Sequence, residues 1–600
     1  MRRGLGNWYS TSVLFPKRRL NGYEIAPDEI FLDSSNLPGR DDPQFEARVV
    51  RPLGNRAIAS VGIAFIAATL VFAARSFELG VVHGKTYAQV SRENRLDHSL
   101  VFAIRGVISD RTGRQLAWNA APAPEAPSLA RSPSATSSAA RPEAGSGVFS
   151  LRRYADMPGL SHILGFVRYP KADSAGHWWR EEMLGVSGAE LVFNDVLAGE
   201  NGTLMVETDA FGNKEEQSII ELARNGEDVA LSIDAEVQSR LFSYVSAHAA
   251  RQGFTGGAAA IMDVRTGELL ALTSFPEYDN AAFTKGDAAA VRAASADPRT
   301  PLLNRAVSGL YAPGSIVKPI FAAAALNEGV VAPETKILST GAITIPNPYD
   351  PSKPSVYRDW TVHGLVDMRE AIAVSSDEYF YQIGGGYGSQ RGLGIRLLDE
   401  YARLFGLGSP SGVELLGEEA GVIPTPEWKA AVFGEDDPWR IGNTYHTAIG
   451  QYGFQITPLQ AVSFIAAVAN GGKLLHPSIL GGSPYGFGAS QYESVGIPDT
   501  YLQVVREGMR LAVTSQRSDA TVKVLNIPGI AIAAKTGTAQ IGARNQWINS
   551  WSVGFWPADN PKYAYAVVLE KAPAGTLSGA APSIRPFFEW LILNRPQYVE

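Results

Sequence analysis

The feature that most constrains this chain is an uncharged run from Ala57 to Ala74, which lies between Arg56 and Arg75. Its 18 residues are close to the roughly 20 apolar residues that span a bilayer as a helix. A buried core helix is the alternative, but no other stretch of the chain has this pattern. A cleaved signal peptide fits less well because the run starts after 56 residues. We therefore predict a transmembrane helix over residues 57–75.

The charges that flank this run do not orient it. Four arginines precede it and four basic residues follow it, namely Arg40, Arg48, Arg51 and Arg56, then Arg75, Lys85, Arg92 and Arg95. Long domains can also be translocated regardless of charge. Residues 1–56 carry nine Lys or Arg and seven Asp or Glu with few periodic apolar positions, and we predict a largely flexible tail there.

The composition limits the remaining possibilities. A chain of 600 residues exceeds a single core and predicts several compact units. A net charge of −7 gives no support to nucleic-acid binding through a basic surface. The chain has no cysteine, which excludes disulfides, thiolate metal sites and a cysteine nucleophile.

A change of pattern near residues 222–228 predicts a domain boundary. Before it, residues 120–147 are mostly Ala, Pro, Ser, Gly and Arg, which predicts a flexible low-complexity insertion. After it, we predict a helix over 235–249 capped by Asp234, a β-hairpin over 257–274 and a helix over 458–469. Strands are predicted over 530–534 and 564–569. Strands that return to one sheet after several helices indicate an α+β domain.

Three short motifs contain the residues best suited to chemistry. Ser315 and Lys318 are three residues apart, so on a helix the hydroxyl and the amine lie on one face. A serine hydroxyl becomes a nucleophile when a base takes its proton, and a partly desolvated lysine can be that base. The second motif, Ser375-Ser376-Asp377, follows a predicted helix over 368–374. The third, Lys535-Thr536-Gly537-Thr538, continues the strand predicted over 530–534.

The order S-x-x-K, S-x-D and K-T-G resembles the motif set of penicillin-binding proteins and serine β-lactamases. Other stretches resemble class B penicillin-binding proteins, and these are Arg105–Gly113, Gly185–Glu190, Thr266–Ala271, Ile449–Gln451, Thr457–Gln460 and Ala469–Gly472. The resemblance implies a cytoplasmic tail over 1–56, the membrane helix, a β-rich pedestal domain over 76–225 and a transpeptidase domain over 226–600. It also implies a single-pass anchor in the cytoplasmic membrane, with the catalytic domain outside.

The same resemblance implies a D,D-transpeptidase that cross-links peptidoglycan. Ser315 would attack the penultimate D-Ala of a stem peptide and form an acyl-enzyme, with Lys318 as base. Lys535 would depress the pKa of Lys318, and Ser375 would pass a proton to the leaving nitrogen. The residues expected to hold the substrate are Thr536, Gly537 and Thr538, and the backbone N–H groups of Ser315 and Thr538 would form the oxyanion hole.

Asp377 stands where Asn is commoner in this family. A carboxylate beside Lys318 would favour the charged amine, so either Asp377 points elsewhere or Lys535 offsets it. Some relatives of this kind bind a metal through aspartates, a histidine and a cysteine. Asp359 and His363 are present here, but Ser376 replaces the cysteine, and we predict no structural zinc and no cofactor.

Asp377, Tyr379–Tyr381 and Asp359-Trp360 resemble the elongation-specific branch of the family, and the division-specific branch is the alternative. The implied partners are peptidoglycan stem peptides, β-lactams, a SEDS-family glycosyltransferase and other elongation-complex proteins. A D,D-carboxypeptidase or β-lactamase is a second hypothesis. A non-catalytic scaffold that activates the polymerase is a third, and it would not need Ser315.

Overall fold

The computed structural model describes residues 54–93, 96–120, 149–174, 177–208, 214–347, 350–482 and 492–600. Almost all of the predicted tail (1–56) and of the predicted insertion (120–147) lies outside these residues, so those predictions remain untested. The chain divides into two compact units, residues 1–94 and 95–600.

The first unit contains the predicted membrane helix. Helix α1 (Asn55–Phe77) continues into a short π-helical turn (Glu78–Val82), and α2 (Gly84–Glu93) follows. The helical stretch from Asn55 to Val82 has 28 residues, its most apolar 18-residue window has a mean hydropathy of 2.3, and none of that window is buried. This helix is therefore long and apolar enough to cross a membrane, as predicted for residues 57–75.

The N-terminal part of the second unit is built from short strands. A three-stranded sheet has the order β1-β9-β10, and a four-stranded sheet has the order β11-β2-β3-β4. The strands are β1 (Leu96–Val101), β2 (Ile108–Ser109), β3 (Gln115–Ala120), β4 (Leu151–Tyr154), β9 (Gly202–Thr208), β10 (Lys214–Glu221) and β11 (Val229–Ala230). Two two-stranded sheets and three short helices complete it, namely β5 (Val167–Arg168) with β8 (Leu184–Gly185), β6 (Lys171–Ala172) with β7 (Trp178–Arg180), α3 (Ser161–Leu164), α4 (Gly188–Val192) and α5 (Asn194–Ala198).

A buried ion cluster joins the elements of this part. Arg105 and Arg152 donate hydrogen bonds of 2.7 Å to the two carboxylate oxygens of Glu190. All three side chains are at most 3% exposed. Two stretches that resembled the family in sequence, around Arg105 and Glu190, thus meet in space. The domain boundary at residue 226 stays a prediction.

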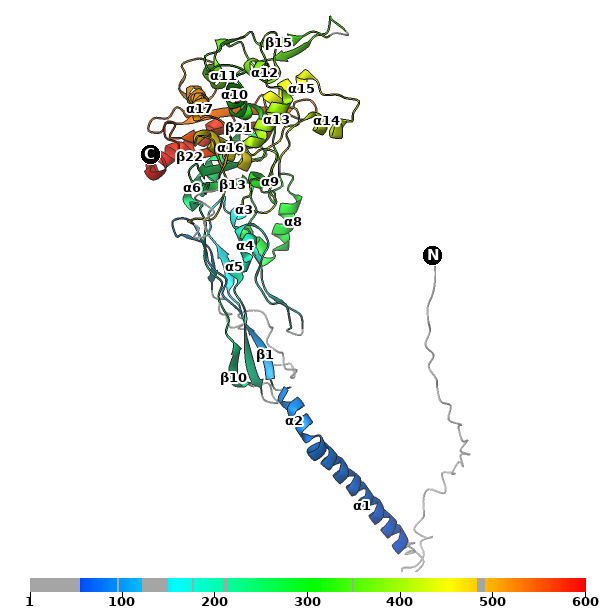
Figure 1. The fold of residues 1–600 in the computed structure, drawn as a ribbon. Helices are drawn as coiled ribbons and strands as arrows, with labels where there is room; N and C mark the ends of the chain where they lie inside the picture. Colours follow the sequence, from blue (N-terminus) through cyan, green and yellow to red (C-terminus); the bar gives the residue numbers. More distant parts are fainter. Residues whose placement is uncertain are drawn as a thin grey trace, which may run out of the picture. The chain divides into compact units, whose positions relative to one another are not determined.

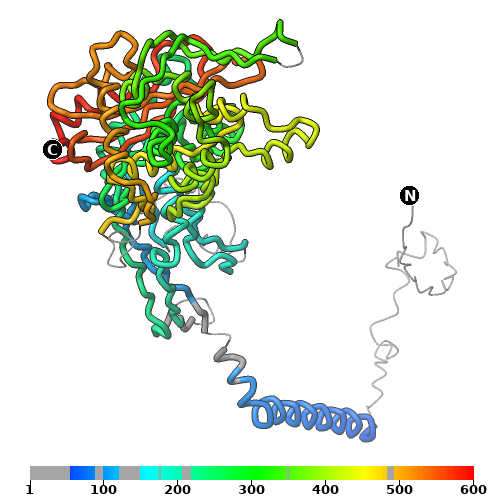
Figure 2. Tube along the Cα trace, turned by 45° about the horizontal axis from the view of Figure 1, so that its top comes forward, coloured from blue at the N-terminus to red at the C-terminus, as the bar shows by residue number. Residues whose placement is uncertain are grey.

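The C-terminal part is organised around a five-stranded antiparallel sheet of order β13-β12-β22-β21-β20. Its strands are β12 (Gly256–Asp263), β13 (Leu269–Phe275), β20 (Ala533–Ile541), β21 (Trp547–Trp556) and β22 (Tyr563–Pro573). The predicted hairpin is β12 and β13. Figure 2 shows residues 500–600, in orange and red, in the same body as residues 230–330. The strand predicted over 530–534 begins only at Ala533, since a turn at residues 528–529 and three residues without regular structure precede it.

Helices cover both faces of this sheet (Figure 1). Ala258, Ala260 and Met262 of β12 belong to one hydrophobic core, while Ala259 and Ile261 belong to the other. This alternation follows from the two-residue period of a strand. Helices α6 (Ala235–Gln252) and α18 (Ala580–Asn594) pack on the second core, and α16 (Pro458–Ala469) packs on the first.

Three predicted helices of this part are confirmed: α6, whose N-cap is Asp234, α11 (Met368–Val374) and α16. The other helices are α7 (Asn280–Lys285), α8 (Ala288–Ala296), α9 (Arg305–Ser308), α10 (Lys318–Asn327), α12 (Asp377–Gly385), α13 (Gly394–Leu404), α14 (Pro426–Phe433), α15 (Ile441–Ala448) and α17 (Asp499–Thr514). Short 3-10 turns lie at Gly314–Val317, Lys523–Leu525 and Pro596–Tyr598. Three two-stranded antiparallel sheets pair β14 (Ile337–Ser339) with β17 (Gly364–Val366), β15 (Ala342–Ile345) with β16 (Ser355–Arg358), and β18 (Lys473–Leu475) with β19 (Tyr492–Ser494).

Candidate active site

Ser315 lies on a 3-10 turn that leads directly into α10. Gly314 has φ +56°, a left-handed conformation that favours glycine, and its N–H donates 2.9 Å to Gly450 O. A Cβ on Gly450 would lie 2.2 Å from Gly314 O, and one on Gly537 would lie 2.7 Å from Pro313 O. The turn is therefore held between two glycines that allow the backbones to approach.

The second motif lies where α11 ends and α12 begins. Ser375 has φ 57° and ψ 39°, which is uncommon for a residue other than glycine. Ser376 then caps α12 by accepting a hydrogen bond from Tyr379 N. Backbone strain of this kind is typical of functional sites, and here it turns the Ser375 side chain away from its own helix toward the two lysines.

The two motif lysines meet at Ser375. Lys318 Nζ lies 2.6 Å from Asp377 Oδ1, 2.8 Å from Ser375 O and 3.4 Å from Ser375 Oγ. Lys535 Nζ lies 2.7 Å from Ser375 Oγ and 2.8 Å from Thr536 O. Both lysines are fully buried. Of the two options left open by the sequence, Asp377 does not point elsewhere, because it forms an ion pair with Lys318.

An open cleft of about 560 Å³ brings the three motifs together. Of the predicted site residues, six line it: Ser315, Ser375, Asp377, Thr536, Gly537 and Thr538. Lys318 and Lys535 lie beneath them and reach the cleft through Ser375. Trp360 and Leu577 form part of the rim, with 54% and 99% of their surfaces exposed.

Several supporting residues had no recognisable signal in the sequence. Glu570 on β22 accepts hydrogen bonds from Tyr311 and from the buried Arg305. Trp551 on β21 donates to Ala312 O. These contacts join strands near the C-terminus to the turn that carries Ser315, a pairing that only the folded sheet creates. Leu577 was also missed, since an exposed leucine in a loop has no distinctive pattern.

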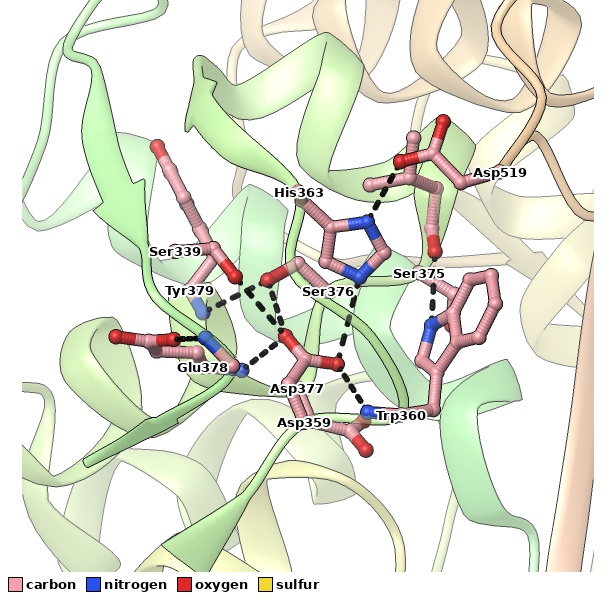
Figure 3. A network of polar contacts seen from close by, with 12 residues as sticks. Ser339, Asp359, Trp360, His363, Ser375, Ser376, Asp377, Glu378, Tyr379 and Asp519 are labelled. Carbon is pink, nitrogen blue, oxygen red and sulfur yellow. Dashed lines mark hydrogen bonds and ion pairs between the residues drawn. The ribbon is translucent and has the colours of Figure 1, made fainter. Parts of the chain in front are cut away.

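A polar cluster beside the second motif contains Asp359 and His363 (Figure 3). Asp359 accepts from Ser376 Oγ at 2.7 Å, from Glu378 N and from Trp360 N. Burial raises the pKa of Asp359, but hydrogen bonds and nearby positive charge outweigh this effect and bring it to about 2. His363 shares a hydrogen bond of 2.8 Å with Asp519, and its Nε2 lies 3.4 Å from Asp359 Oδ1 without hydrogen-bond geometry.

The residues of this cluster do not fit the metal site that the sequence resemblance brought into question. Ser376 supplies a hydroxyl that is already hydrogen-bonded to Asp359, and a neutral hydroxyl is a poor substitute for thiolate. His363 Nδ1 is taken by Asp519. Across the described ranges, no three His, Asp or Glu side chains gather at one point where they could hold an ion.

The cleft as a whole has the parts that serine acyl transfer requires. It contains a hydroxyl on a rigid turn, a second hydroxyl between two buried amines, and a strand edge that a substrate backbone can approach. The fold and the site together place the chain in the class of serine acyltransferases that have an α+β transpeptidase-type domain.

Comparison with known proteins identifies the family. Residues 257–589 match the family described as penicillin binding protein transpeptidase domain, and residues 147–231 match the penicillin-binding protein dimerisation domain. The chain therefore belongs to the penicillin-binding proteins and carries their transpeptidase domain.

Individual relatives support the same family assignment. The chain is 30% identical over 473 residues to peptidoglycan D,D-transpeptidase MrdA of Haemophilus influenzae, covering 74% of this chain and 69% of the relative. A structure of the Helicobacter pylori penicillin-binding protein PBP2 with MreC aligns with a TM-score of 0.64 at 25% identity, over 83% of this chain and 99% of that one. A peptidoglycan synthase complex that coordinates polymerization and crosslinking aligns with a TM-score of 0.66 at 27% identity, over 89% and 98%.

Proposed function

We propose that this chain is the elongation-type peptidoglycan D,D-transpeptidase of its cell, which cross-links stem peptides through an acyl-enzyme on Ser315 and is a target of penicillins. The observation that carries the proposal is the shared cleft of Ser315, Ser375 and the strand from Lys535 to Thr538. The MrdA relatives support the elongation branch over the division-specific branch.

The reaction is a two-step acyl transfer. Ser315 Oγ attacks the carbonyl carbon of the penultimate D-Ala while its proton passes to a neighbouring amine. The C–N bond then breaks, the leaving nitrogen takes that proton, and terminal D-Ala departs. An amine from a second stem peptide next attacks the ester and releases Ser315. Ser375 suits the role of proton carrier because its hydroxyl touches both buried amines.

The exposed edge of β20 would bind the donor peptide. Thr536 and Thr538 line the cleft on either side of Gly537, and their hydroxyls suit the terminal carboxylate of the substrate. The backbone N–H groups of Ser315 and Thr538 are proposed to hold the oxyanion, each such donor contributing about 3 to 4 kcal/mol in acyl transfer. Supporting this, a Cβ on Gly314 would lie 3.0 Å from Thr538 O, so the turn and the strand are in close contact.

Location and partners follow from the anchor and the relatives. Helix α1 would hold the chain in the cytoplasmic membrane with the cleft on the extracytoplasmic side, where peptidoglycan lies. The solved relatives bound to MreC and in a peptidoglycan synthase complex support assembly with elongation proteins and with a SEDS-family glycosyltransferase.

The test uses the full chain in detergent with a fluorescent penicillin and with stem-peptide substrate. The proposal requires covalent label on Ser315, loss of that label in Ser315→Ala, and cross-linked dimer as product. Free tetrapeptide without dimer would instead indicate a carboxypeptidase. Cells that elongate normally with Ser315→Ala as their sole copy would favour the non-catalytic scaffold.

A further inference from the structure

The turn that carries Ser375 is fastened on both sides to a single loop. Its left-handed backbone is strained, and such a conformation persists where the surrounding structure holds it. The backbone carbonyl just before Ser375 accepts a hydrogen bond of 3.2 Å from Trp360 Nε1. After the serine, Ser376 Oγ and Glu378 N donate hydrogen bonds of 2.7 and 2.9 Å to one oxygen of Asp359 (Figure 3). The loop that starts at Asp359 therefore holds the turn in its strained conformation.

The Asp359 carboxylate suits this contact by its chemistry and by its burial. Its side chain is fully buried, and its other oxygen accepts a hydrogen bond of 2.8 Å from Trp360 N. An ionised carboxylate only accepts hydrogen bonds, so it satisfies donors from the loop and from the turn at the same time. An asparagine there would present an NH₂ group on one side, and the donors on that side would lose their acceptor.

The loop is itself held from the opposite side. Asp359 N donates a hydrogen bond of 2.8 Å to Gly341 O, and the N–H groups of Thr340 and Gly341 each donate one of 2.8 Å to the Glu378 carboxylate. Glu378 is only 2% exposed. Thr340 and Gly341 precede β15 and Asp359 follows β16, so the base of that two-stranded sheet and the start of α12 form one hydrogen-bonded unit.

We propose that Asp359 is a positioning residue for acyl transfer, which holds the strained turn so that the Ser375 hydroxyl stays between the two motif lysines. The inference rests on the proposed transpeptidase function. In the sequence Asp359 stood out only as a possible metal ligand, and the structure gives its carboxylate a different task.

The geometry explains why the turn must be held. Ser375 Oγ lies 2.7 Å from Lys535 Nζ and 3.4 Å from Lys318 Nζ. If the turn relaxed to an ordinary backbone conformation, the Cα–Cβ bond of Ser375 would point in another direction and both distances would change. A misplacement of about 1 Å can slow an enzymatic reaction about 100-fold, so a small relaxation is sufficient to be measured.

The decisive variant is Asp359→Asn in the full chain, with benzylpenicillin as the probe. Rapid mixing separates Kd, the dissociation constant of the non-covalent complex, from k2, the rate constant of Ser315 acylation within it. We expect k2 to fall at least about tenfold, because the turn is misplaced. Kd should stay within about threefold, because the Asp359 side chain is fully buried while Trp360 forms the neighbouring wall of the cleft. A smaller fall in k2, or a loss confined to Kd, overturns the proposal.

Ser376→Ala tests the same contact from the turn, and it keeps the proposal falsifiable if Asp359→Asn does not fold. It removes the hydroxyl that donates to Asp359, so k2 should again fall while Kd stays, and an unchanged k2 overturns the proposal. Because both substitutions break one contact, the double variant should lose less than the product of the two single losses. A loss equal to that product also counts against the proposal.

Asp367→Asn is the matched control. Asp367 caps α11 through Glu370 N, at the end of the helix away from Ser375. This variant should keep k2 within about twofold of the wild type, and a loss as large as that of Asp359→Asn would show that any weakened helix cap has the same effect. Each k2 is measured per molecule that titrates with penicillin, so unfolded protein does not enter it. Label that survives Ser315→Ala would sink the proposed function itself, an outcome separate from the Asp359 result.

Discussion

Trp551 donates a hydrogen bond of 3.0 Å from its indole Nε1 to Ala312 O, three residues before the candidate nucleophile. Trp551 is fully buried on β21, the neighbour of the edge strand β20, and it forms an edge-to-face contact with Tyr311 in which the ring centroids are 6.1 Å apart. The sheet therefore sets the position of the Ser315 turn directly, through one side chain.

Replacing Trp551 with Phe removes this hydrogen bond and keeps most of the ring. A buried carbonyl left without its partner costs about 1–3 kcal/mol, so we expect that loss of stability and slower penicillin acylation at Ser315. Denaturant unfolding and labelling rates measure the two effects. Trp547→Phe, on the same strand but away from the turn, is the control, and equal effects from both variants would contradict the assignment.

Because Ser375 has a left-handed backbone conformation, the effect of a substitution there on stability can be distinguished from its effect on acylation. A non-glycine residue in this conformation carries a strain of about 1–2 kcal/mol, which glycine does not. The free energy of unfolding of Ser375→Gly is therefore expected to exceed that of Ser375→Ala by about 1 kcal/mol. Both variants are expected to lose acylation of Ser315. A Ser375→Gly variant that acylates at the wild-type rate would show that the hydroxyl carries no proton.

Glu190 is the shared partner of two buried arginines. Glu190→Gln leaves Arg105 and Arg152 buried without a counter-charge, and breaking a buried pair costs about 3–5 kcal/mol. Glu200→Gln breaks only an exposed pair with Arg224, which is worth at most about 1 kcal/mol. Denaturant unfolding of both variants tests this difference, and similar losses would refute it.

We expect the contact that His162 makes between α3 and the loop at Pro301 to be sensitive to acid. Its Nε2 lies 3.0 Å from Pro301 O, and burial lowers the pKa of His162 to about 4. Between pH 6.5 and 4 the unfolded chain binds this proton and the folded chain does not, so stability falls as the pH drops through that window. The shift corresponds to about 3 kcal/mol at most.

His162→Gln removes the titrating group and keeps a donor for Pro301 O. We expect the variant to lose less stability than the wild type between pH 6.5 and pH 4, measured by denaturant unfolding. His177→Gln, whose side chain is 85% exposed, should leave the pH dependence of the wild type intact. A wild-type slope in His162→Gln would contradict the prediction.

Local sequence signals predicted the parts of the site that depend on neighbours along the chain. Asp234 marks a helix start because its side chain bonds to the next turn, and the three motifs lie on the elements predicted for them. The contacts of Lys318 with Asp377 and of Tyr311 with Glu570 join residues far apart in sequence. Their geometry depends on how α10, α12 and β22 pack, so the sequence left the orientation of Asp377 open.

The glycine contacts around Ser315 also limit how this protein can evolve under antibiotic pressure. Any side chain at Gly450 or Gly537 would collide with the backbone of the turn, so those positions cannot be used to narrow access to the nucleophile. Leu577 is almost fully exposed on the rim and can vary without disturbing the packing beneath, whereas Trp360 donates a hydrogen bond to Val374 O and its ring contacts that of His363. We therefore expect inherited β-lactam resistance in this chain to arise at the rim of the cleft, with the floor unchanged.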